Sequence, residues 1–336
     1  MNHCRAGHLV DDGESHCRYS HPLAVAPVEA QSAPADPWQS LKAAAAQLHA
    51  AGHDFRVEDG RVITGEVPLP RVVNLDLGRE HFKLGLVSDP HLGSRYEQLS
   101  AFRDFYHRAT EEGVDAFLNM GDISDGSEKM HPGRLYELHT QGVDGHLSYA
   151  AAVYPRSSAP TYFINGNHDE SWTKDAGINF GRRLSSIRPD LTYIGSTAAY
   201  LTIGSFKAFL SHPSGGKPYA DSYRLQKVAE ALPVGRPVNA LLVGHLHIHV
   251  YDKIRGIHAM QVPCFQRQYP YLAAKGLYPT IGGVILDVTM TEDGSVSRLR
   301  HELITYPTVE EDDFDAEVAR EIARGWTAEG LVVGAA

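Results

Sequence analysis

Five short apolar runs between residues 84 and 247 each end at residue types that bind metals. The runs read LGLVSDPH, AFLNMGD, TYFINGNHD, KAFLSH and ALLVGHLH. The residues at their ends are Asp89, His91, Asp122, Asn167, His168, Asp169, His212, His245 and His247. Amphipathic segments alternate with these runs, which is the pattern of α/β layers. Because ligands in open α/β sheets bind beyond the carboxyl ends of the strands, we expect all five ends to converge on one edge.

Each of these residues, taken alone, has an ordinary structural explanation. An isolated Asp is commonly a cap or turn residue, an isolated His commonly belongs to the surface or the core, and Asn167 is compatible with a simple turn. Five consecutive run ends of this kind favour a site over packing. The Gly residues before Asp122, Asn167 and His245 would allow a sharp turn or a close backbone approach.

The order of these motifs is D-x-H, G-D, G-N-H-D, H and G-H-x-H, over roughly residues 80–290. This order resembles the calcineurin-like metallophosphoesterase superfamily. The resemblance implies the α/β class, as a four-layer α/β/β/α sandwich around a dinuclear metal centre. In this chain the sandwich would carry a small N-terminal appendage.

The resemblance also assigns metal ligands. One metal would be held by Asp89, His91 and His247. The other would be held by Asn167, His212 and His245, and Asp122 would bridge the two. Pro90 occupies the variable middle position of the first motif, so it removes no ligand but would stiffen that turn.

Such a centre needs these residue types for chemical reasons. Two divalent ions about 3.5–4 Å apart clamp the attacking and leaving oxygens of an in-line displacement, and a carboxylate can bridge both ions. Imidazole and oxygen donors together suit Mn²⁺, Fe²⁺, Zn²⁺ or Ni²⁺. A water held between the ions becomes a hydroxide nucleophile near neutral pH. His168 is predicted to stabilise the transition state or protonate the leaving alkoxide, and Asp169 to orient that imidazole and raise its pKa.

The segment after the last motif bears on the substrate. In CFQRQYPYLAAKGLYPT, two cations, Arg267 and Lys275, alternate with aromatic residues. Rings for base stacking and cations for phosphate are typical of a single-strand nucleic-acid platform. The alternative is that the tyrosines belong to the core and the cations are solvated.

Two further stretches resemble enzymes that act on nucleic acids. The first motif continues as H-L-G-S, which resembles the Mre11 and SbcD-like nucleases. The stretch GHLHIHVYDKIRGIHAMQVPCFQRQ is similar to phage and prokaryotic phosphoesterases that carry small N-terminal DNA-binding-like modules. Against this, 31 Lys and Arg face 41 Asp and Glu, a net charge of −10, so any basic groove would have to be local.

Three functions follow from these patterns. The leading prediction is a dinuclear phosphodiesterase that hydrolyses DNA or RNA. The first alternative is a phosphomonoesterase acting on phosphoproteins or small phosphate esters. The second is a non-catalytic nucleic-acid-binding protein that kept the fold, although all seven predicted ligand positions carry the expected residue types.

The N-terminus contains a short duplication, HCRAGH and HCRYSH. Two Cys and two His in two clusters can close a tetrahedral structural zinc site. The predicted ligands are Cys4, His8, Cys17 and His21, with His3 and His16 as competing candidates. The alternative is a chance repeat in a His-rich tail.

We divide the chain into five segments on these grounds. They are the Cys/His module at 1–24, an Ala/Pro-rich linker at 25–35, a helix-plus-hairpin appendage at 36–72, the catalytic domain at 78–305, and an acidic segment at 306–336. The appendage has helix-start signals at Asp36 and Pro37 and a hairpin turn at Asp59-Gly60. It resembles part of a winged helix, or it simply packs on the main domain.

Composition points to the cytoplasm. No run approaches the roughly 20 apolar residues that span a bilayer, and the N-terminus lacks the apolar core of a signal peptide. The chain has three cysteines, too few for a disulfide framework at this length. We therefore expect a cytoplasmic protein without membrane partners, and its oligomeric state is left open.

Overall fold

The computed structural model describes residues 2–3, 9–10, 43, 55–58, 61–64, 71–216 and 218–309. The chain divides into two units, Met1–Val67 and Pro68–Ala336. In the described part of the chain, no helix is both long and apolar enough to cross a membrane.

The first unit contains two antiparallel strand pairs among its described residues. Strand β1 (Asn2–His3) pairs with β2 (Leu9–Val10). Strand β3 (Phe55–Glu58) pairs with β4 (Arg61–Thr64), and these two strands flank Asp59-Gly60 as the predicted hairpin requires. The four predicted zinc ligands and the predicted helix start lie outside the described residues, so both stay predictions.

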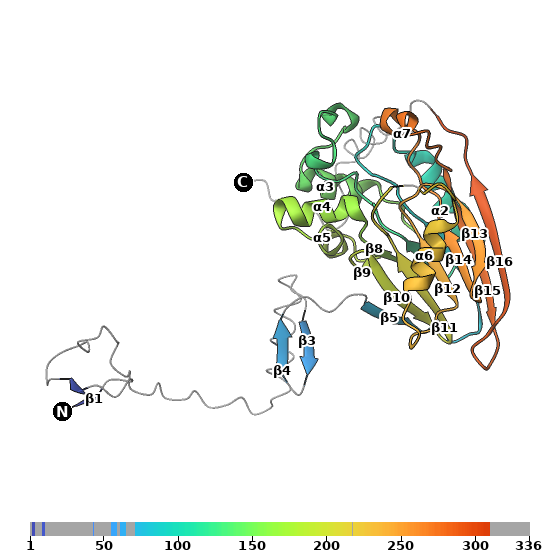
Figure 1. Ribbon diagram of the computed structural model, residues 1–336, viewed down its shortest axis with the longest axis horizontal. Helices are drawn as coiled ribbons and strands as arrows, with labels where there is room; N and C mark the ends of the chain where they lie inside the picture. Colours follow the sequence, from blue (N-terminus) through green and yellow to red (C-terminus); the bar gives the residue numbers. More distant parts are fainter. Residues whose placement is uncertain are drawn as a thin grey trace. The chain divides into compact units, whose positions relative to one another are not determined.

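The second unit contains two six-stranded sheets (Figure 1). The order of the first sheet is β16-β15-β6-β7-β8-β9. Its strands are β6 (His81–Val87), β7 (Ala116–Asn119), β8 (Thr161–Ile164), β9 (Leu191–Gly195), β15 (Gly282–Met290) and β16 (Val296–Thr305). Strands β6 to β9 are parallel, whereas β15 and β16 continue the sheet in antiparallel pairs.

The order of the second sheet is β13-β14-β12-β11-β10-β5. Its strands are β5 (Arg71–Leu75), β10 (Ala198–Ile203), β11 (Phe206–Ser211), β12 (Ala240–Val243), β13 (Val250–Ile254) and β14 (Ile257–Gln261). The pairs β11–β12 and β12–β14 are parallel. Because β5 pairs in parallel with β10, the sandwich starts before residue 78, the boundary predicted from the sequence, and takes in the end of the predicted appendage.

Five of the six described α-helices belong to two outer layers, and the short last one lies beyond the end of the sheets (Figure 1). The described helices are α2 (Leu99–Glu111), α3 (Val143–Val153), α4 (Asn167–Ala176), α5 (Phe180–Ile187), α6 (Tyr223–Ala231) and α7 (Pro270–Ala274), with 3₁₀ turns η1 (Glu128–Met130) and η2 (Leu135–Glu137). The helix expected from Leu99 to Ala109 is α2, and Gly113 follows it at a φ of 73°, a left-handed conformation suited to a helix end.

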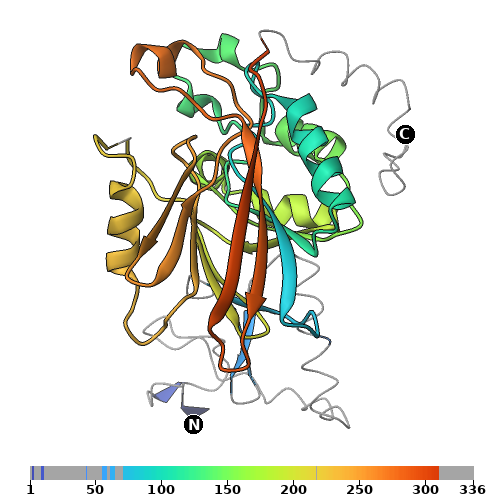
Figure 2. The same cartoon turned by 90° about the vertical axis from the view of Figure 1, so that its right-hand side faces the viewer.

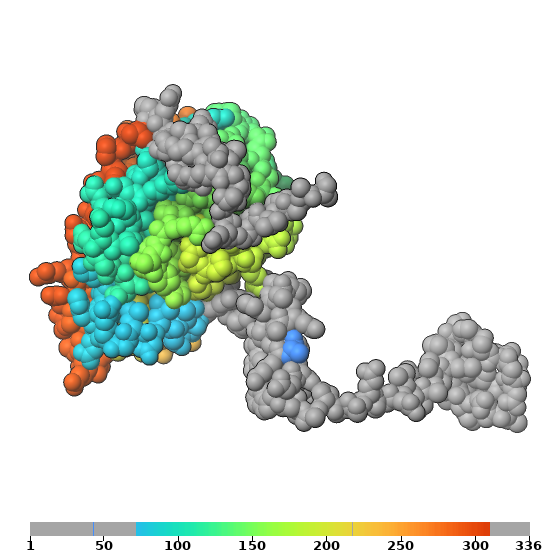
Figure 3. All heavy atoms as spheres, turned by 180° about the vertical axis from the view of Figure 1, so that it is seen from behind, coloured from blue at the N-terminus to red at the C-terminus, as the bar shows by residue number. Residues whose placement is uncertain are grey.

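Three apolar clusters hold the layers together. The central one lies between the sheets and joins Leu84 and Leu86 of β6 to Leu201, Leu210 and Leu242 of the second sheet. A second packs α2, α3, α4 and α5 on the outer face of the first sheet, and a third packs α6 on the second sheet. Figure 2 shows α6 on one side of the sheets and α2 on the opposite side, and Figure 3 shows the α2 side from outside. The predicted four-layer α/β/β/α sandwich is confirmed.

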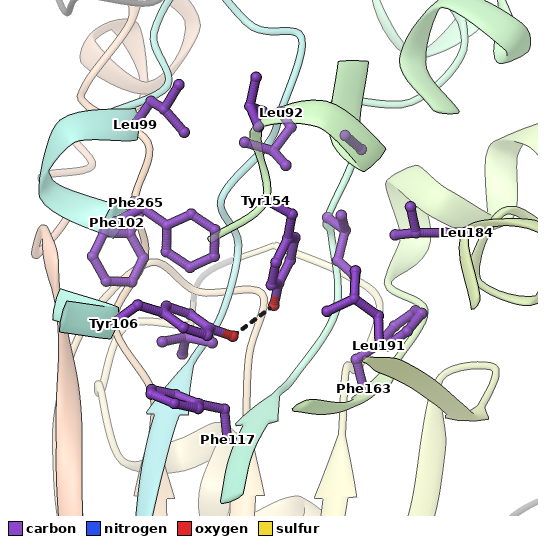
Figure 4. Packing of buried hydrophobic residues seen from close by; sticks show 14 of the residues in the cluster. Leu92, Leu99, Phe102, Tyr106, Phe117, Tyr154, Phe163, Leu184, Leu191 and Phe265 are labelled. Carbon is purple, nitrogen blue, oxygen red and sulfur yellow. Dashed lines mark hydrogen bonds between the residues drawn. The ribbon is translucent and has the colours of Figure 1, made fainter. Parts of the chain in front are cut away.

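The helix-side core depends on aromatic stacking as well as area. The rings of Tyr106 and Phe117 stack with centroids 3.9 Å apart, and the Tyr106 and Tyr154 hydroxyls lie 3.0 Å apart, within hydrogen-bond distance (Figure 4). Alternate residues of β7 serve the two cores, since Phe117 faces the helices and Leu118 the other sheet. This alternation fixes the strand register and therefore the position of the loop after β7.

Candidate metal centre

The five predicted motifs follow five strands directly. Asp89 and His91 come after β6, Asp122 after β7, and Asn167 begins α4 after β8. His212 follows β11, and His245 and His247 follow β12. The structure brings all seven predicted metal ligands together, but from the ends of strands in both sheets and not from one edge of a single sheet as expected.

Three residues form what we name the Asp89 cluster: Asp89, His91 and His247. Asp89 Oδ1 lies 3.2 Å from His247 Nε2 and 3.8 Å from His91 Nε2. The two Nε2 atoms lie 3.1 Å apart. Two imidazole nitrogens and a carboxylate oxygen thus face one point.

The Asn167 cluster consists of Asn167, His212 and His245. His212 Nε2 lies 3.1 Å from Asn167 Oδ1, and ligand atoms of Asp122, His212 and His245 lie within 4.8 Å of one another. Asp122 Oδ2 is 3.1 Å from His212 Nε2 and 3.7 Å from His91 Nε2. This oxygen therefore borders both clusters, which is the place of a bridging ligand.

Three of the four clustered imidazoles, those of His91, His212 and His245, are also held at the nitrogen that faces away from the cluster. His212 Nδ1 donates to the Met120 carbonyl at 2.6 Å, and a nitrogen of His245, Nε2, donates to the Gly215 carbonyl at 2.6 Å. His91 Nδ1 lies 2.7 Å from Asp125 Oδ1. Since each of these contacts fixes one nitrogen, the other faces the cluster and can offer its lone pair to a metal once its proton is lost, as in histidine ligands of metals. The donor set therefore fits two divalent ions.

Asp125 is a site residue that the sequence reasoning missed. Its buried carboxylate contacts His91, and Gln266 Nε2 donates to it at 3.3 Å. The imidazoles of His91 and His168 lower its pKa to about 2 against the effect of burial. The signal that could have found it is its position three residues after Asp122, in the same strand-end loop.

The backbone at the site is strained. Outside glycine, the described residues with positive φ are Asp89 (51°), His91 (47°), Asp122 (51°), His245 (82°), His247 (56°) and Arg255 (51°). Five of these six are predicted metal ligands. Such conformations cost free energy and persist where the surrounding fold holds them, which is common at functional sites.

Two of the glycines noted in the sequence are required by close approach. A Cβ on Gly166 would collide with the Asp122 carboxylate, and one on Gly244 would lie 2.8 Å from the Met120 carbonyl oxygen. Any side chain at either position would push two motif loops apart. The glycines thus let loops from different strands meet at the centre.

Charge is balanced within the two clusters. Burial raises the pKa of Asp89 and Asp122, but neighbouring imidazoles, His212 first, outweigh it and hold both pKa values below the usual range. Burial lowers the pKa of His91 and His212, but the carboxylates around them raise these pKa values to about 10 and about 9. A bound cation would displace those protons, because an imidazole ligand must be neutral.

The predicted pairing of Asp169 with His168 is wrong. The Asp169 carboxylate accepts hydrogen bonds from the backbone of Ile123, Ser124 and Gly166 at 2.8–3.0 Å, and so fixes the loop that carries Asp122. The reason is geometric, since neighbours in the first turn of a helix point in different directions.

His168 is held by another residue. Its Nδ1 donates to the Asp125 carbonyl at 2.7 Å. Its pKa is lowered and not raised, because burial and the positive charge of His91 outweigh the carboxylates of Asp122 and Asp125. His168 nevertheless borders the Asp89 cluster, with its ring 4.6 Å from that of His91.

The two predicted substrate cations lie in one aromatic region. The Arg267 guanidinium lies 4.8 Å from the Tyr96 ring centre, and Lys275 Nζ lies 5.8 Å from that of Tyr271. Phe265 belongs to the core, whereas Tyr271 and Tyr278 are exposed, unlike the buried tyrosines of the alternative interpretation.

Comparison with known proteins identifies the family. The model of the calcineurin-like phosphoesterase family matches residues 82–249, half of the chain. The chain belongs to this family. As a calcineurin-like phosphoesterase it is a metal-dependent phosphoester hydrolase by family, with its candidate metal-binding residues in place.

One curated relative of this phosphoesterase is the DNA polymerase II small subunit of Methanothermobacter thermautotrophicus. The two are 25% identical over 268 residues, which are 66% of this chain and 55% of the relative. The chain thus spans about half the length of that protein.

Solved structures that are similar to this chain share little sequence identity with it. An archaeal phosphodiesterase is 14% identical with a TM-score of 0.37, over 66% of this chain and 99% of that one. The 5'-nucleotidase precursor of Thermus thermophilus is 16% identical with a TM-score of 0.37, over 74% of this chain and 59% of that one.

Proposed function

We propose that this phosphoesterase is a dinuclear phosphodiesterase that acts on DNA or RNA. The observation that carries the proposal is the shared position of Asp122 between the Asp89 and Asn167 clusters. A site built to bind two cations around one carboxylate suits attack on a phosphate ester.

The residues that would hold the two ions are Asp89, His91, His247, Asn167, His212, His245 and the bridging Asp122. When bound, such ions supply an activated water and neutralise charge that develops on the phosphate. Manganese, iron, zinc and nickel all suit this mixture of imidazole and oxygen donors.

His168 is proposed as the residue that moves a proton at the leaving oxygen. Because Nδ1 donates to the Asp125 carbonyl, Nε2 is the atom left to hold and deliver a proton. Burial lowers the pKa of His168, and the Asp125 carboxylate, 3.7 Å from Nδ1, partly offsets this effect. Asp169 acts as a positioning residue for the Asp122 loop.

Nucleic acid is proposed as the substrate on two grounds. The curated relative is named as a subunit of a DNA polymerase, and cations and tyrosines gather beside the Asp89 cluster. The net charge of −10 makes such a local arrangement necessary, because the chain cannot bind phosphates by overall basicity.

The test is hydrolysis of bis(p-nitrophenyl) phosphate and of single-stranded DNA and RNA with Mn²⁺. We expect turnover of the diester and of at least one polymer, and loss of both on addition of chelator. Faster turnover of p-nitrophenyl phosphate than of the diester would favour a phosphomonoesterase. No hydrolysis of any ester by metal-loaded protein would contradict the proposal.

A further inference from the structure

A chain of stacked aromatic rings lies beside the metal centre and takes no part in binding metal. The Tyr96 and Tyr269 rings stack with centroids 5.3 Å apart, and the Tyr269 and Tyr271 rings with centroids 6.1 Å apart. Arginines lie over both ends, since the Arg267 guanidinium is 4.8 Å from the Tyr96 ring and that of Arg134 is 4.9 Å from the Tyr271 ring. We name these five residues the tyrosine surface.

Three separate segments build the tyrosine surface, and backbone hydrogen bonds fix them. The Arg267 amide donates to the Tyr96 carbonyl at 2.8 Å. The Arg95 amide donates to the Glu137 carbonyl at 2.8 Å, and the buried Glu137 carboxylate accepts from Arg134 at 2.7 Å. The rings are therefore held in place before any ligand binds, which reduces the entropic cost of binding.

The tyrosine surface adjoins the centre at one end. Gln266, next to Arg267 in the chain, donates to Asp125, and Asp125 contacts the His91 ligand. Strand β16 runs in the same direction as β6 to β9, because both β16 and β6 are antiparallel to β15. Figure 1 shows that α7, the helix that contains Tyr271, lies beyond the end of the sandwich to which β16 points. The surface thus lies at the sheet edge that carries the metal ligands.

Exposure at the outer end distinguishes this cluster from a core. Tyr271 is 45% exposed, and Tyr136, two residues after Arg134, is 62% exposed. Arg95 and Lys275 are also exposed, so positive charge gathers here on a chain of net charge −10. Exposed tyrosines flanked by cations match the two chemical parts of a nucleotide, a flat base and an anionic phosphate.

We propose that the tyrosine surface binds unpaired bases of a single-stranded nucleic acid whose phosphate backbone leads to the metal centre. The inference rests on the proposed phosphodiesterase function and specifies its substrate as an unpaired strand. A duplex hides its base faces in its own stack, so it cannot use the rings. Its tight binding would need many more cations than this surface has.

The experiment measures binding alone, in chelator, so that cleavage plays no part. Fluorescence anisotropy compares a short labelled oligo(dT) strand, an abasic strand of equal length, and a duplex. We expect the full chain to prefer oligo(dT) to both of the others. Tyr271→Ala should weaken oligo(dT) binding about tenfold, within the range for loss of one stacked base, and leave abasic binding unchanged.

Two matched variants control for the loss of the tyrosine hydroxyl and for the loss of an exposed tyrosine elsewhere on the protein. Tyr271→Phe keeps the ring and should keep the wild-type affinity. Tyr223→Ala removes another exposed tyrosine with a lysine over its ring, Lys227 at 5.7 Å, but on α6 against the other sheet, and should change nothing.

Equal affinity for the oligo(dT) and abasic strands, tighter binding of the duplex, or wild-type affinity in Tyr271→Ala would each overturn the inference. Binding of neither strand would do so too, and would point to a protein partner for this surface. Since no turnover is measured, failure here leaves the phosphodiesterase proposal standing. A protein that hydrolyses no ester but still prefers oligo(dT) would contradict only the phosphodiesterase proposal.

Discussion

The two halves of the metal centre differ in what holds their ligands. In the Asp89 cluster, His91 is backed by a side-chain carboxylate, that of Asp125. In the Asn167 cluster, both imidazoles are backed by main-chain carbonyls, those of Met120 and Gly215. The first cluster also has a charged ligand of its own, Asp89, where the second has the neutral amide of Asn167.

This difference indicates that metal affinity depends more on charge in the Asp89 cluster than in the Asn167 cluster. Two carboxylates beside His91, Asp89 and Asp125, give the Asp89 cluster the larger negative charge, so it should hold a dication more tightly. The Asn167 cluster relies on backbone geometry, which single side-chain substitutions leave in place. We therefore expect unequal affinities and unequal sensitivity to mutation.

The largest effect is expected where the halves meet. Asp122→Ala removes the shared carboxylate, so hydrolysis of bis(p-nitrophenyl) phosphate should fall to the rate without enzyme and metal content should drop at both clusters. Elemental analysis and steady-state rates measure the two effects. Asp252→Ala, an acidic residue of β13, is the control, and retained turnover in Asp122→Ala would refute the assignment.

His168→Ala should reduce turnover by about 10²–10⁴-fold, the usual contribution of a general acid. Because the residue belongs to neither cluster, metal content should stay at the wild-type level. The loss should be greatest for poor leaving groups, which need the proton most. A series of aryl phosphodiesters measures this, and an equal loss across the series would exclude the acid role.

Asp125→Asn separates the two halves. The amide keeps the shape but loses the charge behind His91, so affinity at the Asp89 cluster should fall about 10–100-fold. The Asn167 cluster should keep its affinity, because its backing carbonyls are unchanged. Calorimetric titration with Mn²⁺ resolves binding at the two clusters. Equal loss of affinity at both would show that the Asp125 charge does not act on the Asp89 cluster alone.

The smallest effect concerns the order of metal release. During dialysis against increasing chelator, the first ion should leave the Asn167 cluster. Asn167→Asp adds a charged ligand there, so its affinity should rise by about tenfold or less and the two steps should move closer together. Metal content at each chelator concentration reports the order of release. If both ions left together, and Asn167→Asp did not change this, the difference in charge would not set the two affinities.

The sequence predicts the metal centre well because each strand end can be recognised from a few neighbouring residues, and these strand ends come together in the fold. Apolar runs that end in Asp, Asn or His become parallel strands within each sheet, and the carboxyl ends of parallel strands meet at one edge of their sheet. That the two sheets bring these edges together is set only by the assembled sandwich. The contacts behind the ligands follow a different logic. Gln266 reaches Asp125 from 141 positions away, a pairing that only the assembled sandwich sets.

Asp169 shows that residues adjacent in the sequence can also mislead a prediction. Its place directly after His168 suggests a pair, yet both belong to the first turn of α4. There the Asp169 carboxylate satisfies the free amide of Gly166, as acidic residues often do at helix starts. Adjacency in sequence predicted the wrong partner because side-chain direction on a helix turns with every residue.

The proposed function requires that two cations bind around Asp122. Anomalous diffraction from crystals grown with Mn²⁺ tests it most directly, with no reliance on a chosen substrate. We expect two peaks, one in the Asp89 cluster and one in the Asn167 cluster, on either side of the Asp122 carboxylate. No peak at either cluster, or a single peak with the other cluster empty at saturating Mn²⁺, would contradict it.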